Sequence, residues 1–376
     1  MSAGTLAILL SLLAVAGFLV SVVATRVMIW FAPKIGLVDQ PGHRKIHAAP
    51  KPLGGGAGIF LGVAVPMLAG VLLNAVMSVA DPVERALARG SVEQLPLVLA
   101  FLAAGFGMWL LGLVDDRRAL GPFIKLGVQL AITTALVLPF PEVRLLTVLG
   151  LVPSVVVTVL WIAGVTNAFN FLDNMDGLSA GVAAICATVL MATSVLAGQV
   201  FVPATLALFV GACVGFLVWN FPLRGNAKIF MGDSGSLFVG LVLGVMTVRT
   251  TYVAPGADFT TLGGGWYGVF APLIVLAVPL YDMTVVSCIR IARGKSPFVG
   301  DTNHFSHRLV QRGMTKRVAV LCIYLVTAAT GLAALLLPLV NSPLAAWLIV
   351  GQTLLILGVV MLLERHPLPA AKDGVP

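Results

Sequence analysis

Long apolar runs alternate with short polar segments along the whole chain. Most runs come close to the roughly 20 apolar residues that a membrane-spanning helix needs, and within them only Asp282 carries a charge. The pattern predicts an all-α polytopic membrane protein with about 11 transmembrane helices, of which the run 236–248 is short enough for a thin or broken span. The predicted spans are 6–23, 56–79, 95–114, 126–140, 145–169, 178–197, 202–221, 236–248, 267–289, 318–340 and 344–363.

The composition requires a membrane as the solvent for the apolar surface of these runs. Of 376 residues, 59% are hydrophobic and only 10% are charged, which is too apolar for one water-soluble core. We predict a single transmembrane domain over residues 1–363 and a disordered cytoplasmic tail over residues 364–376. The cysteines all fall within apolar runs and lack ligand spacing, which predicts buried structural roles.

The basic residues are distributed unequally between the two sides of the membrane. If successive runs cross in alternating directions, all but four of the 23 lysines and arginines fall on one side. The positive-inside rule places that side in the cytoplasm, with the N-terminus in the periplasm and the C-terminus in the cytoplasm. The net charge of +8 therefore reflects topology and contacts with anionic lipid or phosphate, and it does not indicate a nucleic-acid partner.

Residue types suited to phosphate and metal chemistry gather in the loops on the basic side. Transporters place their polar residues inside the spans, whereas an enzyme with a water-soluble substrate collects them in loops on one side. The distribution favours a membrane enzyme and leaves a transporter or flippase as the alternative of another class. The loops are 26–53, 115–125, 167–177, 222–235 and 290–317.

The first loop combines basic residues with three glycines. Lys45 and His47 precede Gly54, Gly55 and Gly56, which lead into an apolar run. Free N–H groups at the start of a helix can add to basic side chains in holding an anion. A positive-inside loop with a flexible hinge is an equal alternative.

The second loop carries two adjacent acids, Asp115 and Asp116, with Lys125 opening the next run. Neighbouring carboxylates repel each other unless a cation offsets their charge. They predict a divalent-metal or proton-accepting site, because Mg²⁺ prefers oxygen ligands. The alternative is a surface salt-bridge cluster.

The third and fourth loops add further oxygen ligands. Asn170, Asp173 and Asp176 are three residues apart, which places them on one face if the helix frays here. Asp233 lies among small residues that let the backbone approach a ligand closely, and Phe230 can stack on a base. Helix capping by Asp176 and a simple turn around Asp233 are the alternatives.

The fifth loop contains His304, His307 and Arg308, which suit contacts to a diphosphate. A solvated basic loop is the alternative. Asp282 lies inside a span and is a candidate functional residue by its position, or it pairs with a base near the interface, where Arg290 lies two turns further on.

Together these motifs resemble the polyprenyl-phosphate N-acetylhexosamine-1-phosphate transferase superfamily, the glycosyltransferase 4 family. The resemblance runs from Asp39 to about Arg312, and the first loop is most similar to the WecA and TagO branch. That branch reads His-x-His-His in the fifth loop, whereas this chain has Ser306 at the third position. An MraY-like transferase that uses UDP-MurNAc-pentapeptide, or one that uses another UDP-amino sugar, is the runner-up.

The resemblance implies an activity and a set of site residues. It implies transfer of N-acetylglucosamine 1-phosphate from UDP-N-acetylglucosamine to undecaprenyl phosphate, at the cytoplasmic face of a bacterial inner membrane, with Mg²⁺, for which Mn²⁺ is a candidate substitute. Asp233 and Asn170 would be metal ligands, and Asp115 and Asp116 the acids at the reacting centre. The oligomeric state stays open, with a homodimer as one alternative. The residues implied in substrate binding are Lys45, His47, Lys125, Asn167, Asp173, Asp176, Phe230, His304, His307 and Arg308.

Overall fold

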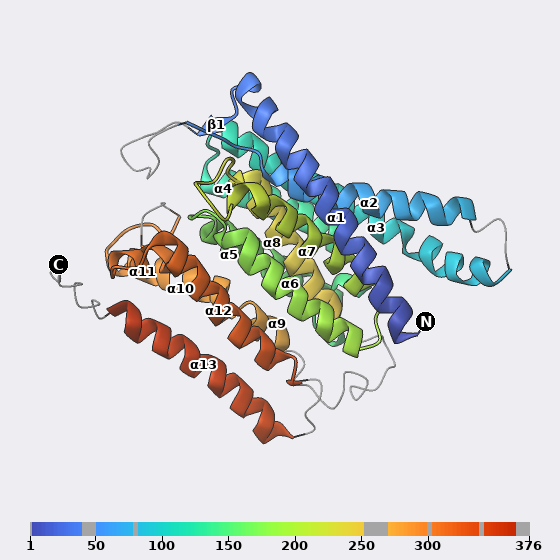
Figure 1. Cartoon of the computed structure of the whole chain (residues 1–376). Helices are drawn as coiled ribbons and strands as arrows, with labels where there is room; N and C mark the ends of the chain where they lie inside the picture. Colours follow the sequence, from blue (N-terminus) through green and yellow to red (C-terminus); the bar gives the residue numbers. More distant parts are fainter. Residues whose placement is uncertain are drawn as a thin grey trace.

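The protein is a bundle of α-helices (Figure 1). The computed structural model describes residues 2–39, 50–77, 82–251, 270–298, 303–337 and 342–365. The helices are α1 (Ala3–Phe31), α2 (Gly56–Met77), α3 (Pro82–Arg117), α4 (Pro122–Val137), α5 (Leu151–Leu172), α6 (Leu178–Leu196), α7 (Phe201–Asn220), α8 (Gly232–Thr251), α9 (Ala271–Val275), α10 (Ala277–Ala292), α11 (Phe305–Gln311), α12 (Lys316–Ala334) and α13 (Pro343–Arg365). Short 3-10 turns lie at Ala32–Ile35, Pro141–Val143 and Thr147–Leu149. Strands β1 (Val38–Asp39) and β2 (Lys51–Pro52) pair antiparallel, with Val38 opposite Pro52.

The described residues include nine helices long and apolar enough to cross a membrane, together with the shorter apolar helix α4. The chain is therefore an all-α multi-pass membrane protein, as predicted. The expected span 267–289 is not one helix, because α9 ends at Val275 and α10 begins at Ala277. The expected thin span 236–248 is instead an unbroken helix of 20 residues, α8.

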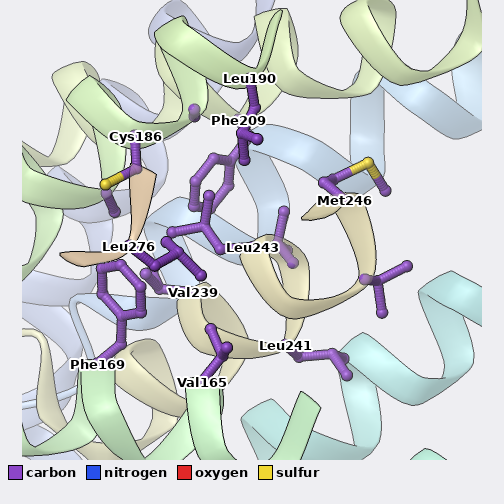
Figure 2. Packing of buried hydrophobic residues seen from close by; sticks show 14 of the residues in the cluster. Val165, Phe169, Cys186, Leu190, Phe209, Val239, Leu241, Leu243, Met246 and Leu276 are labelled. Atoms are coloured by element: carbon purple, nitrogen blue, oxygen red, sulfur yellow. The ribbon is translucent and has the colours of Figure 1, made fainter. Parts of the chain in front are cut away.

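Helix α8 lies at the centre of the bundle. Figure 2 shows its side chains Val239, Leu243 and Met246 among residues of neighbouring helices, such as Phe169 and Phe209. The outer helices are different, since α1 and α13 expose many large apolar side chains. These exposed side chains are the surface that a lipid bilayer would cover.

Polar contacts join many helix ends at one end of the bundle. The C-terminal ends of α3 and α5 meet the N-terminal ends of α4 and α8 there. The Arg365 end of α13 reaches α11 at the same end, whereas the N-terminus lies at the other (Figure 1). The described parts of the loops with the predicted site residues therefore gather at a single end.

Candidate functional site

Three oxygen-bearing side chains from three helices surround the ammonium group of Lys125, in the first turn of α4. Its Nζ donates to Asp115 Oδ2 at 3.0 Å, to Asn170 Oδ1 at 3.3 Å and to Asp233 Oδ2. Asn170 Nδ2 also donates to Asp233 Oδ1 at 2.9 Å. The structure thus brings together Asp115, Lys125, Asn170 and Asp233, which we call the acid–lysine cluster.

The acid–lysine cluster has the donor set of a site for a hard cation. Two carboxylates and one amide oxygen already surround a positive charge. Mg²⁺ is commonly held by one or two carboxylates, with water and substrate phosphates completing its shell. In the part of the chain that the structure describes, no group of three or more His, Cys, Asp or Glu side chains is arranged to hold a metal. The cluster fits Mg²⁺ when oxygens of the substrate and of water complete the coordination.

Asp116 contacts different groups from its neighbour Asp115. Its Oδ1 accepts from the backbone N–H of Asp233 at 2.8 Å, and its Oδ2 accepts from that of Ser234 at 3.2 Å. A carboxylate in this position satisfies N–H groups that have no partner within their own helix, and it interacts favourably with the helix dipole. Asp116 therefore caps α8 and fixes the backbone that carries Asp233.

The chain leaves the helical path after Leu172. Helix α5 ends just before Asp173, so Asn170, Asp173 and Asp176 do not lie on one continuous helix. Asp173 still lies within the field of the other acids. Burial, followed by the charges of Asp233, Asp116 and Asp176, raises the pKa of Asp173 well above its ordinary value.

Lys51 lies between Asp176 and Phe230. The sequence did not predict Lys51 as a substrate-binding residue. Its Nζ is 3.7 Å from Asp176 Oδ2 and 4.7 Å from the centre of the Phe230 ring. The one feature of the sequence that pointed to Lys51 is its position in the basic first loop. The anion hypothesis is wrong for two amides of that loop, because the N–H groups of Gly55 and Gly56 donate to carbonyls of the α7–α8 loop.

Asp282 holds the start of the histidine loop, residues 303–311. This fully buried carboxylate accepts from the backbone N–H of Phe305 at 2.5 Å and lies 2.9 Å from Nδ1 of His304. The guanidinium of Arg290 lies 3.5 Å from Nε2 of the same histidine and 5.1 Å from the centre of the Phe171 ring. The acid within the predicted span therefore positions a predicted substrate-binding histidine.

Other contacts hold the histidine loop further along. Ser306, at the position where the chain departs from the His-x-His-His pattern, donates from Oγ to Asn174 Oδ1. His307 is buried, with its ring centre 6.4 Å from that of His304. Arg308 donates to Glu364 Oε2 at 2.8 Å, so the protein itself binds a guanidinium that we predicted to bind substrate.

Asn167 packs two helices together. Its Nδ2 donates to Gln129 Oε1 at 2.7 Å and to the carbonyl of Ala163 at 2.8 Å. Both N–H bonds of the amide are used inside the bundle, and the substrate contact of Asn167 stays a prediction. The predicted contacts of Lys45 and His47 lie outside the described residues.

Comparisons with known proteins agree with one another. Residues 98–251 match the model of Glycosyl transferase family 4. The chain is 32% identical over 335 residues to the probable undecaprenyl-phosphate N-acetylglucosaminyl 1-phosphate transferase of Bacillus subtilis (strain 168), covering 86% of this chain and 84% of that protein. It is 32% identical over 338 residues to the decaprenyl-phosphate N-acetylglucosaminephosphotransferase of Mycolicibacterium smegmatis, covering 84% and 79%. It is 26% identical over 337 residues to the undecaprenyl-phosphate alpha-N-acetylglucosaminyl 1-phosphate transferase of Escherichia coli (strain K12), covering 85% and 83%.

Proposed function

The chain belongs to glycosyl transferase family 4, and we propose that it transfers N-acetylglucosamine 1-phosphate from UDP-N-acetylglucosamine to undecaprenyl phosphate, releasing UMP. Relatives named for this transfer match most of the chain. The observation that carries the proposal is the acid–lysine cluster, where carboxylates and an ammonium group meet at the helix ends. Two anionic substrates can react only where their charges are offset.

The reaction is a phosphoryl transfer with a defined exchange of bonds. An oxygen of the lipid phosphate forms a bond to the β-phosphorus of the UDP-sugar, and the bond from that phosphorus to the UMP oxygen breaks. Positioning and charge neutralisation supply most of the catalysis in such transfers. Lys125 offsets the charge of the reacting phosphates, and Asp115 holds Lys125 in place at 3.0 Å.

Asp233 and Asn170 are the residues that would hold Mg²⁺. When bound, the metal supplies Lewis-acid neutralisation of the diphosphate charge. Asp116 keeps Asp233 in place through the backbone of α8.

The donor nucleotide-sugar binds between the α5–α6 turn, the α7–α8 loop and the histidine loop. Phe230 offers a ring for the uracil, beside Lys51 and Asp176. His304 and His307 bind the diphosphate or the sugar. The connection between these elements supports this arrangement, since Ser306 of the histidine loop bonds to Asn174 of the α5–α6 turn.

The site faces the cytoplasm of a bacterial inner membrane. This placement rests on the excess of lysines and arginines in the loops at this end of the bundle. The acceptor's prenyl tail stays in the bilayer while its phosphate reaches the helix ends. The product starts a cell-envelope glycan on its lipid carrier.

The test is UMP release by purified protein given undecaprenyl phosphate, Mg²⁺ and one UDP-sugar at a time. We expect release with UDP-N-acetylglucosamine, and a loss of roughly 100-fold or more for Asp233→Asn, since the neutral side chain removes charge stabilisation from the reacting centre. Glu142→Gln, in the 3-10 turn Pro141–Val143, is a matched control that should keep full activity.

Each substrate outcome has a separate meaning. Release only with UDP-MurNAc-pentapeptide or with another UDP-amino sugar would replace the proposed donor. No release with any UDP-sugar would remove the proposed enzyme activity. Full activity of Asp233→Asn would remove the metal and charge roles given to the acid–lysine cluster.

A further inference from the structure

Glu364 is a buried acid at the end of an otherwise apolar helix. It is the only acidic residue of α13, which exposes Leu354, Leu355 and most of its other leucines. Its own side chain is only 5% exposed. A buried carboxylate is unfavourable unless it is paired and hydrogen-bonded. The burial of this carboxylate therefore depends on the groups that pair with it.

That partner belongs to the histidine loop. Glu364 Oε2 accepts from Arg308 Nε at 2.8 Å and from the Tyr281 hydroxyl at 3.2 Å. Arg308 Nη1 donates to the carbonyl of Asn303, the residue just before His304. One guanidinium thus links α13 to the start of the loop, and Tyr281 adds a contact from α10.

The histidine loop needs such contacts because it has little structure of its own. Helix α11 has seven residues, too short to be stable alone. Asp282 holds its start and Ser306 joins it to Asn174. Arg308 lies directly after His307, so the Glu364 contact fixes the end of the histidine pair that Asp282 does not reach.

We propose that Glu364 is a positioning residue of the transferase site, which holds the histidine loop through Arg308 so that His304 and His307 stay in place to bind the nucleotide-sugar. The inference rests on the proposed function. It gives α13 a role in donor binding although α13 contributes no side chain to the acid–lysine cluster.

The test compares Glu364→Gln with wild type for kcat, for KM toward each substrate and for Tm in detergent. We expect KM for UDP-N-acetylglucosamine to rise about tenfold, because a neutral amide holds the guanidinium less strongly than a carboxylate does. KM for undecaprenyl phosphate should stay unchanged. Tyr281→Phe keeps the ion pair and loses one hydrogen bond, so it should raise the donor KM by a smaller factor.

The opposite results are equally specific. A purely structural role would lower the active fraction of Glu364→Gln and its Tm, and would leave both KM values unchanged. If Glu364→Gln does not fold, Tyr281→Phe decides, and an unchanged donor KM in that variant overturns the inference. A wild type that releases no UMP would overturn the proposed function, whereas an active wild type with an unaltered Glu364→Gln would overturn this inference alone. Glu142→Gln is again the matched control.

Discussion

Asp115 and Asp116 are neighbours in the chain, yet their carboxylates have different partners. Asp115 accepts from Lys125 Nζ and from the backbone N–H of Leu120. Asp116 accepts from two backbone N–H groups of α8. Adjacent acids look equivalent in a sequence because their partners, far away in the chain, are not visible there.

This division predicts different effects for two matched substitutions. Asp116→Asn should lower stability by about 1 kcal/mol as well as activity, since an amide has only one acceptor oxygen for the α8 N–H groups. Asp115→Asn should lower UMP release strongly with a smaller change in Tm, because its amide can still accept from Leu120 while it no longer attracts Lys125. Thermal unfolding and UMP release of the two purified variants measure this. Equal loss of Tm in both would contradict the capping role of Asp116.

Residue types at the ends of apolar runs predicted much of the acid–lysine cluster. Asp115, Asn170 and Asp233 stand out because acidic and amide side chains gather in the loops on the basic side of the membrane. Glu364 gave no such signal, since it was placed at the start of the predicted tail, whereas α13 extends to Arg365. Its partner Arg308 comes 56 positions earlier, and no local pattern connects the two.

At the scale of helices, α8 shows why hydropathy misjudged a span. It is surrounded by protein and carries glycines and serines that let other helices approach closely. Such residues lower the apolar content of the segment, which made it look short. A proline breaks the interior of a helix, whereas its missing N–H is tolerated in the first turn. Pro279 lies in the first turn of α10, so the break between α9 and α10 has a local cause.

The crossing of α3 and α8 depends on Gly112. A Cβ at this position would lie 2.3 Å from the backbone of Asp233 and Ser234, and backbone atoms cannot move aside as a flexible side chain can. We predict that Gly112→Ala shifts Asp233 and lowers UMP release at least about tenfold, with a lower Tm. Gly70→Ala is the control, because no atom lies within 4 Å of its added Cβ. Wild-type activity in Gly112→Ala would show that the helices can separate without disturbing the site.

At the scale of the whole molecule, the two ends of the bundle differ in chemistry. Polar contacts from α3, α4, α5, α8, α11 and α13 gather at one end. The sequence predicted this gathering because alternating spans bring every second loop to the same side. It did not predict which loops touch, since that depends on how the helices pack.

The orientation of the bundle in the membrane can be tested with single cysteines at its two ends. Ala197, after α6, is exposed at one end, and Leu223, in the α7–α8 loop, is 95% exposed at the site end. In a Cys288→Ser, Cys322→Ser background, we predict that a membrane-impermeant maleimide labels Ala197→Cys in intact cells. Leu223→Cys should react only after the cells are permeabilised, because the positive-inside rule places the basic loops in the cytoplasm. The reverse pattern would put the acid–lysine cluster outside the cell, where no cytoplasmic nucleotide-sugar could reach it, and the proposed reaction would then be impossible in this orientation.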